Sequence, residues 1–491
     1  MRPSNPVFVG VGQVTWRAAA LADALSPVAL MAEAARLAAR DAGLGSLPDV
    51  DLLAAVGTLS YRSADPARCV AAELGVQARR TAVTTMGGNS PQSLVNEMAG
   101  RIQRGELDVA LLTGGEARRS QRRGRAAGVK PWADDADLTP ASETIGADFV
   151  MSSHDEIARE IWMPIQIYPL FESALRAAAG RTVDDHRQHL GALWSRFAAV
   201  AATNPHAWTQ SGPSATEIST PSPSNRMVGL PYTKMMNSNN DVDQAAALIV
   251  CSTAKAEALG IPRDRWVFPV SGSDCHEHPF ISNRWTFADT PAIRAGGATA
   301  LNLAGLSIDN IDIIDLYSCF PSAVQLGAAS LGLSLDRQLT RTGGLSFAGG
   351  PWNNYSMHAI ATVVGDLRND PSSNGLVWAN GGFASKHSFG IYRTVPPVDG
   401  FRYESPQAEL DALPQRAVAS TTDANGPATV EAYTVMHDRE GQPERAIVSC
   451  LLTDGRRAWG TSTDVTTATA LTDGEWVGRS VRLQDGGVEV G

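Results

Sequence analysis

The chain has 491 residues, of which 43% are hydrophobic, and its formal net charge is −10. This length suits about three domains of ordinary size, and the acidic balance argues against nucleic acid as a general partner, because a phosphate-binding surface needs an excess of Lys and Arg. Five scattered cysteines form no C-x-x-C pair, so neither a disulfide framework nor a zinc site is indicated. We expect a cytoplasmic protein that does not enter a membrane, since no apolar stretch approaches ~18 residues.

An internal repeat organises most of the chain. An alanine-rich helical pattern at 26–44 leads through SLPDVD into the strand-like LLAAVG, and a helical pattern at 290–306 leads through SIDNID into IIDLYSCF. Both copies contain a helix, the tripeptide Ala-Gly-Leu, an Asp-containing turn and a strand. Two halves with the same order of elements indicate a duplicated α/β unit.

A glycine turn before a helix is repeated as well. GGN at 87–89 precedes a helical pattern with Leu94, Val95 and Met98 on its apolar face, and the strand VALLTGG follows. In the other half, GGPWNN at 349–354 precedes a helical pattern and the strand LVWANGG. Both strands are nearly continuous apolar runs, which is typical of strands buried on both faces. We therefore expect a parallel or mixed sheet covered by helices in each half.

The segment from about 116 to 234 interrupts this pattern. It contains charged loops, one helical part at 168–180 and a Ser/Pro-rich stretch. Because long loops in compact domains usually cover a site or are disordered, we expect an insertion that covers the core. The arginine-rich part at 117–130 is either a solvated loop or a patch for an anionic ligand.

After about residue 395 the pattern changes to a linker and then to strands without helices between them. ATVEAYTVMH, RAIVSCLLT, RRAWGTST and RSVRL are separated by turn sequences, which predicts a small five-stranded barrel. Arg456, Arg457 and Trp459 are balanced by several acidic residues, so nucleic acid is a minor option for this module. The predicted domains are 1–255 with an insertion at about 116–234, then 256–400, then 405–491.

Several of these segments together carry a family resemblance. The two halves, NPHAW at 204–208, PYTKMMNSNNDVDQAAALIV at 231–250, GELDVALLTGGEA and IDIIDLYSCF resemble the thiolase superfamily over about residues 5–395. They are most similar to its sterol-carrier-protein and thiolase-like branches. The whole chain resembles the type-1 thiolase-like proteins, which are acetyl-CoA acetyltransferase-like and carry an extra C-terminal domain.

This resemblance implies a fold and a class of activity. The fold is α/β, a duplicated thiolase fold with five layers (αβαβα), followed by a small all-β OB-like barrel. The implied ligand is acyl-coenzyme A, with no further cofactor and no metal, and the family activity is carbon–carbon bond formation or cleavage. A monomer or a homodimer is expected.

Carried over residue by residue, the catalytic positions of the family are altered. The nucleophilic cysteine corresponds to Gly88 or Asn89, where a helix N-terminus would stabilise a thiolate by ~0.3–1 kcal/mol. Neither side chain can be acylated in the required way. Ser90 is either the N-cap of the helix or a replacement nucleophile, and we favour the cap because Pro91 follows. The histidine of the Gly-His-Pro motif corresponds to Gly350.

The remaining family motifs are altered too. Asn380 stands near the position of the second cysteine, and the adjacent Lys386 and His387 could supply acid–base chemistry. Tyr317 replaces the histidine that organises the oxyanion hole in the sterol-carrier branch, and a tyrosine can donate a hydrogen bond to a developing oxyanion. Cys319 is either a packed thiol or a surviving nucleophile.

Two functions follow from this pattern. The first is an aldolase-like enzyme that acts on acyl-CoA thioesters without a covalent intermediate, with Tyr317, His387 and Asn380 as catalytic residues. The alternative is an inactive carrier of acyl-CoA or lipid, or a scaffold for a protein partner in lipid metabolism. Cysteine-dependent thiolase activity is expected to be absent or very low. The predicted ligand contacts are Asn89, Ser90, Arg122, Arg123 and Lys386, with the arginines binding phosphates.

Overall fold

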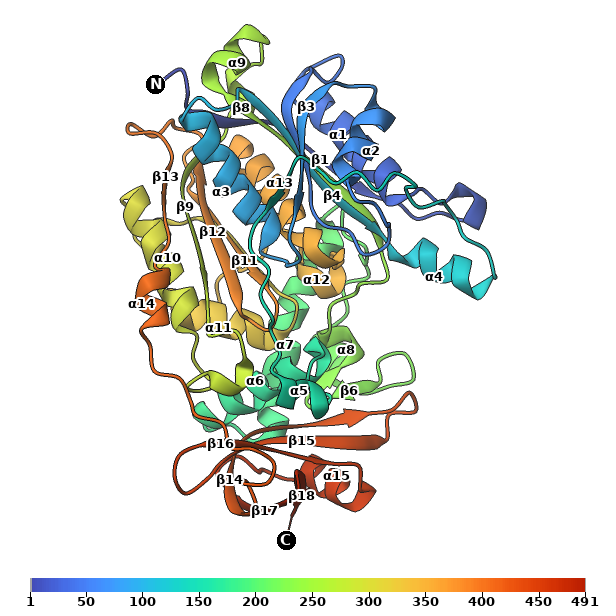
Figure 1. Ribbon diagram of the computed structural model, residues 1–491, viewed down its shortest axis with the longest axis vertical. Helices are drawn as coiled ribbons and strands as arrows, with labels where there is room; N and C mark the ends of the chain where they lie inside the picture. Colours follow the sequence, from blue (N-terminus) through green and yellow to red (C-terminus); the bar gives the residue numbers. More distant parts are fainter. Residues whose placement is uncertain (1, 491) are drawn as a thin grey trace.

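The computed structural model describes residues 2–490, and two β-sheets form its larger part (Figure 1). The first sheet contains β1 (Pro6–Thr15), β2 (Val50–Ala55), β3 (Ala78–Thr84), β4 (Val109–Ala117), β5 (Glu143–Ile145) and β8 (Asp243–Ser252). The second contains β9 (Phe268–His276), β10 (Ile313–Leu316), β11 (Gly375–Gly381), β12 (Lys386–Arg393) and β13 (Arg402–Glu404). Their orders are β1-β8-β4-β2-β3-β5 and β10-β11-β12-β9-β13. The series β1-β8-β4-β2 corresponds to β9-β12-β11-β10, so the predicted duplication is confirmed.

Helices form three layers around these sheets. The outer layers are α1 (Pro27–Asp41) and α2 (Pro66–Leu74) on the first sheet, and α10 (Pro291–Ala304) and α11 (Pro321–Leu331) on the second. The helices α3 (Ser90–Gln103) and α13 (Tyr355–Asn369) lie between the sheets and contact strands of both. The predicted five-layered order is therefore present. Leu94, Val95 and Met98 of α3 are fully buried because a sheet covers the helix on each side.

Within the described residues, the segment between β4 and β8 contains five α-helices. It contains α4 (Arg118–Ala126), α5 (His154–Ala158), α6 (Pro164–Ala178), α7 (Val183–Thr203), α8 (Ala215–Ser219) and the short strands β6 (Met227–Gly229) and β7 (Tyr232–Thr233). Helices α5 to α8 lie between the two-sheet body and the C-terminal barrel (Figure 1). The prediction of loops with one helical part was wrong for α7, whose buried residues Leu190, Trp194, Phe197 and Ala201 recur at helical spacing.

The C-terminal module is a closed barrel of five strands. Its elements are β14 (Gly426–His437), β15 (Pro443–Leu451), β16 (Arg457–Ser462), α15 (Val465–Thr472), β17 (Ser480–Gln484) and β18 (Gly487–Glu489). The strands pair in the order β14-β15-β16-β18-β17, and β17 returns to β14. With β16 and β18 parallel and a helix after the third strand, the module has an OB-like arrangement.

Helix α15 corrects the expectation of a barrel without helices. Valine and threonine have low helix propensity, so the sequence VTTATALT gives a weak helical signal. In the fold, the Asp464 carboxylate accepts a hydrogen bond from the Thr467 backbone N–H at 2.8 Å and caps the helix. Ala468 and Leu471 are fully buried against the barrel. Packing and the cap therefore outweigh the local propensity.

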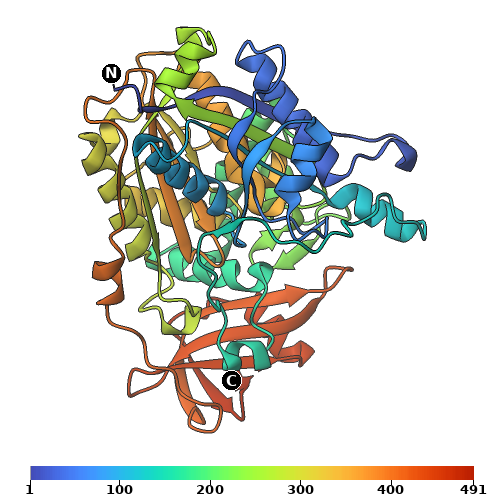
Figure 2. The same ribbon diagram turned by 45° about the horizontal axis from the view of Figure 1, so that its top comes forward.

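The barrel is fixed to the rest of the molecule through β16. The Arg457 side chain is fully buried, pairs with Glu431, and donates to the carbonyl oxygens of Ser282 (2.7 Å) and Arg284 (2.6 Å). Figure 2 shows the barrel beneath the helices that follow β5. In OB-folds that bind oligonucleotides, the second and third strands supply the binding face. Here the third strand, β16, packs on the chain's own residues, with Trp459 also buried.

Short elements complete the connections. They are α9 (Thr253–Ala258), α12 (Gly344–Phe347), α14 (Gln407–Asp411) and single 3₁₀ turns, of which η6 (Trp352–Asn354) precedes α13. Within residues 2–490, no helix combines the length and apolar character needed to cross a membrane.

Candidate functional site

The turn at 85–89 connects β3 to α3 and is held by side chains from the second half. The Asn353 side-chain oxygen accepts a hydrogen bond from the Gly87 N–H at 3.0 Å. The Ser356 hydroxyl donates to the Gly88 carbonyl oxygen at 2.8 Å. The start of α13 therefore fixes the backbone of the turn at the start of α3.

The Tyr317 side chain closes the space above Gly88. A Cβ atom on Gly88 would lie 2.7 Å from Cζ of Tyr317 and 2.5 Å from the carbonyl oxygen of Asn380, and closer still to the Tyr317 hydroxyl. This hydroxyl thus occupies the position that a side chain of residue 88 would take. Burial raises the pKa of Tyr317, so its hydroxyl is protonated at neutral pH.

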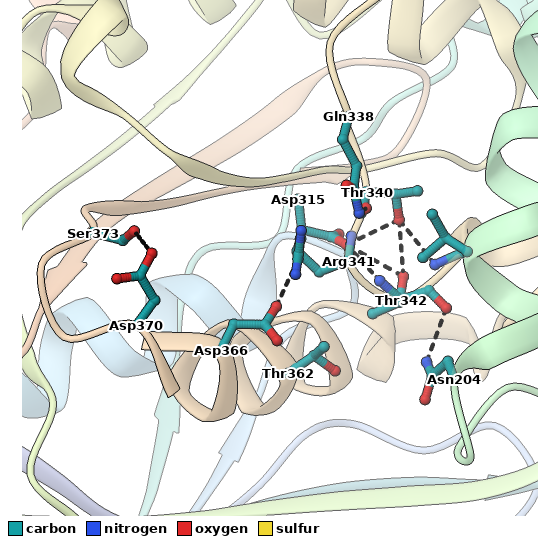
Figure 3. Close-up of polar contacts among 12 residues, drawn as sticks. Asn204, Asp315, Gln338, Thr340, Arg341, Thr342, Thr362, Asp366, Asp370 and Ser373 are labelled. Carbon is teal, nitrogen blue, oxygen red and sulfur yellow. Dashed lines mark hydrogen bonds and ion pairs between the residues drawn. The ribbon is translucent and has the colours of Figure 1, made fainter. Parts of the chain in front are cut away.

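A buried carboxylate network centred on Asp315 lies at the end of β10, two residues before Tyr317 (Figure 3). Asp315, in β10, accepts hydrogen bonds from the backbone N–H groups of Arg341 (2.8 Å) and Thr342 (3.1 Å). Its other oxygen accepts a bond from the Tyr355 hydroxyl at 3.1 Å. The Tyr355 ring meets the Tyr317 ring edge-on, with centroids 5.5 Å apart. The network therefore ties the end of β10 to the following loop and packs a ring against Tyr317.

A cavity of about 400 Å³, which we call the central cavity, surrounds this turn and Tyr317. Its lining contains no Asp, Glu, Lys, Arg or His. Four lining residues, Leu59, Met86, Trp162 and Met163, are between 37% and 51% exposed and therefore mark its entrance. The polar side chains of the lining, apart from tyrosines and a cysteine, are amides and a hydroxyl: Asn237, Ser238, Asn240, Asn353 and Asn380.

The titratable groups of the central cavity are neutral. Burial raises the pKa of the Cys319 thiol to about 12 and the pKa of Tyr168 well above its usual value. Tyr168 comes from α6 and stacks on Phe320, with centroids 4.5 Å apart. Cys319 fits the interpretation as a packed thiol, because a thiol with this pKa is not a thiolate at neutral pH.

Asn380 faces the central cavity together with Tyr317. Its amide nitrogen donates to the Tyr168 hydroxyl at 3.0 Å, while its side-chain oxygen is buried without a hydrogen-bond partner in the described chain. Such an unpartnered acceptor is costly unless a water or a ligand satisfies it. Two of the three predicted catalytic residues are therefore brought together here, and their catalytic role stays a prediction.

His387 lies on β12, directly opposite Asn380 of β11. It is fully buried, its Nδ1 accepts a hydrogen bond from the Trp378 indole at 3.4 Å, and it does not line the central cavity. Burial lowers the pKa of His387 to about 3, so the ring is neutral at physiological pH. The structure therefore brings this histidine next to Asn380 but not into the central cavity, and its catalytic role stays a prediction.

Gly350 begins the corresponding turn of the second half. Its N–H donates to the Asn239 carbonyl oxygen at 2.9 Å, and a Cβ atom on it would lie 2.9 Å from the side-chain oxygen of Asn240. Asn240 in turn lines the central cavity. His358 of α13 does not line that cavity. Its Nδ1 is 2.9 Å from the Gln13 side-chain oxygen, and burial lowers its pKa to about 3.

Asn89, Ser90 and Lys386 line a second cavity of about 480 Å³ beside the same turn, which we call the lateral cavity. Ser90 is the first residue of α3, so the cap position belongs to Asn89, and the N-cap prediction for Ser90 was wrong. The Ser90 hydroxyl instead donates to the Thr85 carbonyl oxygen at 2.9 Å. None of these three residues lines the central cavity.

The predicted phosphate-binding arginines already have partners. Arg122 makes two hydrogen bonds, of 2.7 and 2.6 Å, to the Asp241 carboxylate. Arg123 donates to backbone carbonyls at the end of the segment that follows β1. From the same helix, Arg118 lies over the ring of Trp352, 5.9 Å from its centroid, and Trp352 lines the central cavity. Among the arginines of α4, Arg118 therefore lies against the wall of the central cavity.

Sequence reasoning missed the amide lining. Asn237 and Asn240 belong to the run NSNND directly before the buried strand β8, and this run of polar residues beside a fully buried strand was an available signal. The Asp315 network carried no such signal, because its partners lie 25 or more residues away. Among residues 2–490, no group of His, Cys, Asp and Glu could hold a metal ion.

Comparison with known proteins agrees with this architecture. Residues 406–487 match a family model described as "Thiolase-like protein type 1 additional C-terminal domain". No curated protein matches the chain. Two solved structures share its fold at low identity over 80% of this chain and 98% of theirs. They are the Ltp2-ChsH2(DUF35) aldolase (18% identity, TM-score 0.59) and the dimeric peroxisomal thiolase of Saccharomyces cerevisiae (15%, 0.56).

A third solved structure is similar over nearly the full length. It is the crystal structure of a monomeric SCP2-thiolase like protein type 1 from Mycobacterium smegmatis. The two chains are 33% identical, with a TM-score of 0.82, and the match covers 98% of this chain and 97% of that one. The chain described here belongs to the SCP2-thiolase-like protein type 1 family.

Proposed function

We propose that this protein binds an acyl thioester in the central cavity and holds it without forming a covalent intermediate. The observation that carries the proposal is an uncharged lining of amides and apolar side chains around Gly88, with the Tyr317 hydroxyl next to it. An acylated pantetheine arm is neutral and narrow and carries amide groups, so asparagine side chains complement it. The apolar entrance suits an acyl chain.

Covalent acyl transfer finds no support in the same lining. It needs a nucleophile that a base or a lowered pKa activates. Gly88 and Gly350 supply neither group, and the pKa of Cys319 is raised to about 12. We therefore propose that cysteine-dependent thiolase activity is absent.

The phosphates of coenzyme A would meet the helix α4. Because Arg122 already pairs with Asp241, we assign the first phosphate contact to Arg118, which stacks on a wall residue of the cavity. A single partly exposed arginine adds a modest share of the affinity, and we expect a Kd in the micromolar range or weaker.

A second function is favoured by one observation, the protonated Tyr317 hydroxyl in a cavity that Asn380 also lines. A protonated phenol can donate a hydrogen bond to a developing oxyanion, as aldolase-like carbon–carbon bond cleavage requires. This chemistry also requires a base. No described residue that lines the central cavity carries a group that accepts a proton at neutral pH. We therefore propose aldolase-like cleavage only as a second function, after thioester binding.

Calorimetry with S-acetyl-pantetheine and acetyl-CoA tests binding directly. We expect heat from both, with acetyl-CoA bound more tightly because of its phosphates. Leu59→Trp narrows the entrance and is expected to weaken both ligands at least tenfold, whereas Val465→Trp, at a 63% exposed position on the barrel, leaves them unchanged. Absence of heat at millimolar ligand rejects the proposal. If the parent protein cleaves 3-ketoacyl or β-hydroxyacyl thioesters, the aldolase-like activity becomes the preferred function.

A further inference from the structure

The lateral cavity contains a buried cation that lacks a carboxylate partner. The Lys386 side chain is 7% exposed, and its ammonium donates one hydrogen bond, to the Met86 carbonyl oxygen. No Asp or Glu of residues 2–490 lies within ion-pair distance of it, and Asp148 acts on it only through space. An ammonium has three N–H donors, so two of them have no acceptor in the described chain.

The buried ammonium of Lys386 is stabilised if an anion binds next to it. Removing an ammonium from water is costly unless an anion and hydrogen bonds replace the lost hydration. The surroundings of Lys386 supply one carbonyl oxygen, the ring of Phe149, whose centroid lies 5.5 Å from the Lys386 nitrogen, and the charge of Asp148 beyond ion-pair distance. Burial accordingly lowers the pKa of Lys386.

The other charged groups of the lateral cavity are already engaged. Arg101 pairs with Glu97 at 2.7 Å and with Glu143 at 2.9 Å. The half-buried Asp274 carboxylate accepts hydrogen bonds from Asn96 at 2.9 Å and from the Ser93 hydroxyl. Lys386 is therefore the cation of this lining that has donors left for a ligand.

We propose that the lateral cavity is a second ligand site, which binds a small organic carboxylate through the Lys386 ammonium. Its volume of about 480 Å³ falls in the range of small-molecule sites. The hydroxyl groups of Thr85 and Ser93 line the same cavity and supply polar contacts for the ligand. Phe149 and Tyr403 supply its apolar walls. This site differs in charge from the central cavity and does not depend on thioester binding there.

The test uses butyrate, succinate and benzoate as probes, with butyramide and benzamide as neutral counterparts. In calorimetry on the full chain, we expect at least one carboxylate to bind with a Kd of ~1 mM or tighter, and its amide to bind at least tenfold more weakly. Lys386→Met keeps the length of the side chain and removes the charge, and is expected to weaken the carboxylate at least tenfold. Lys234→Met, at an exposed lysine, is the matched control and is expected to change nothing.

A second variant keeps the test decisive if Lys386→Met does not fold. Ala147 lines the lateral cavity at an exposed position, so Ala147→Trp fills the space and leaves Lys386 in place. It is expected to abolish carboxylate binding and to leave S-acetyl-pantetheine binding unchanged, which separates this site from the central cavity. The proposal is overturned if no carboxylate binds below ~10 mM, or if Lys386→Met or Ala147→Trp binds it as the parent does.

Discussion

The two glycine turns that precede α3 and α13 occupy corresponding places in the two halves, yet their surroundings differ. Above Gly88, the nearest atoms belong to a buried aromatic ring and to the Asn380 backbone, neither of which can move without disturbing a strand. Above Gly350, the nearest atom is the side-chain oxygen of Asn240 at 2.9 Å, and the next atoms are 3.5 Å away. A glycine is thus required in the first turn, whereas a rotation of one amide would admit a side chain in the second.

This difference links two changes that look independent in the sequence. A side chain at residue 88 and a tyrosine at residue 317 exclude each other, because both would fill one volume beside the central cavity. No aromatic side chain of the described residues fills the volume that a side chain at residue 350 would occupy. The loss of a side chain at Gly88 is therefore coupled to Tyr317, and four substitutions test this comparison.

The largest effect is expected for Gly88→Cys. Overpacking a buried position costs ~1–3 kcal/mol or more, and here the inserted atoms meet both a ring and a backbone carbonyl. Urea unfolding measures the loss. Gly365→Cys is the matched control, because no atom outside its own helix lies within 4 Å of a Cβ atom at that position, and it is expected to be neutral or slightly stabilising.

A double-mutant cycle shows whether Tyr317 causes the loss. Adding Tyr317→Ala removes the ring, so the double variant is expected to be more stable than the sum of the two single effects by at least ~1 kcal/mol. Additive effects would show that the Asn380 carbonyl alone closes the first turn.

The large elements were predictable because their residues are buried on every side. The apolar runs of β4 and β11 and the helical spacing in α3 and α13 follow from their place between layers, and the repeat made them recognisable twice. Helix α15 was not predictable in the same way, because contacts with distant strands and a capping aspartate stabilise it against its own composition.

The sequence predicted which loops form the site, but it did not predict the direction in which each side chain points. Tyr317 and Asn380 reach the central cavity as expected for residues at strand ends. Lys386 and His387 were placed together after a glycine turn, but β12 already begins at Lys386. Both side chains line the lateral cavity, but their hydrogen-bond partners differ: the Lys386 ammonium donates to the Met86 carbonyl oxygen, and the His387 ring accepts from the Trp378 indole. The pairing of Arg122 with Asp241 depends on folding across 119 residues, and no local pattern contains that information.

A smaller effect is expected for Gly350→His. The Asn240 amide can rotate away from a new side chain, so we expect a loss below ~1 kcal/mol in the same urea measurement. Thiolysis of 3-ketoacyl-CoA should remain absent in this variant, because residue 88 still supplies no nucleophile. A loss as large as that of Gly88→Cys would show that both turns are equally closed and would remove the distinction between the halves.

The smallest effect on stability is expected for Tyr317→Phe. The Tyr317 hydroxyl makes no hydrogen bond with the described residues, so its removal leaves no orphaned partner, and the edge contact with Tyr355 is kept. We expect a change below ~1 kcal/mol in unfolding free energy. If the hydroxyl donates to a bound thioester, S-acetyl-pantetheine should bind about two- to tenfold more weakly, which corresponds to one neutral hydrogen bond. Unchanged affinity would mean that Tyr317 only fills the space above Gly88, and its role would then be steric in both the fold and the site.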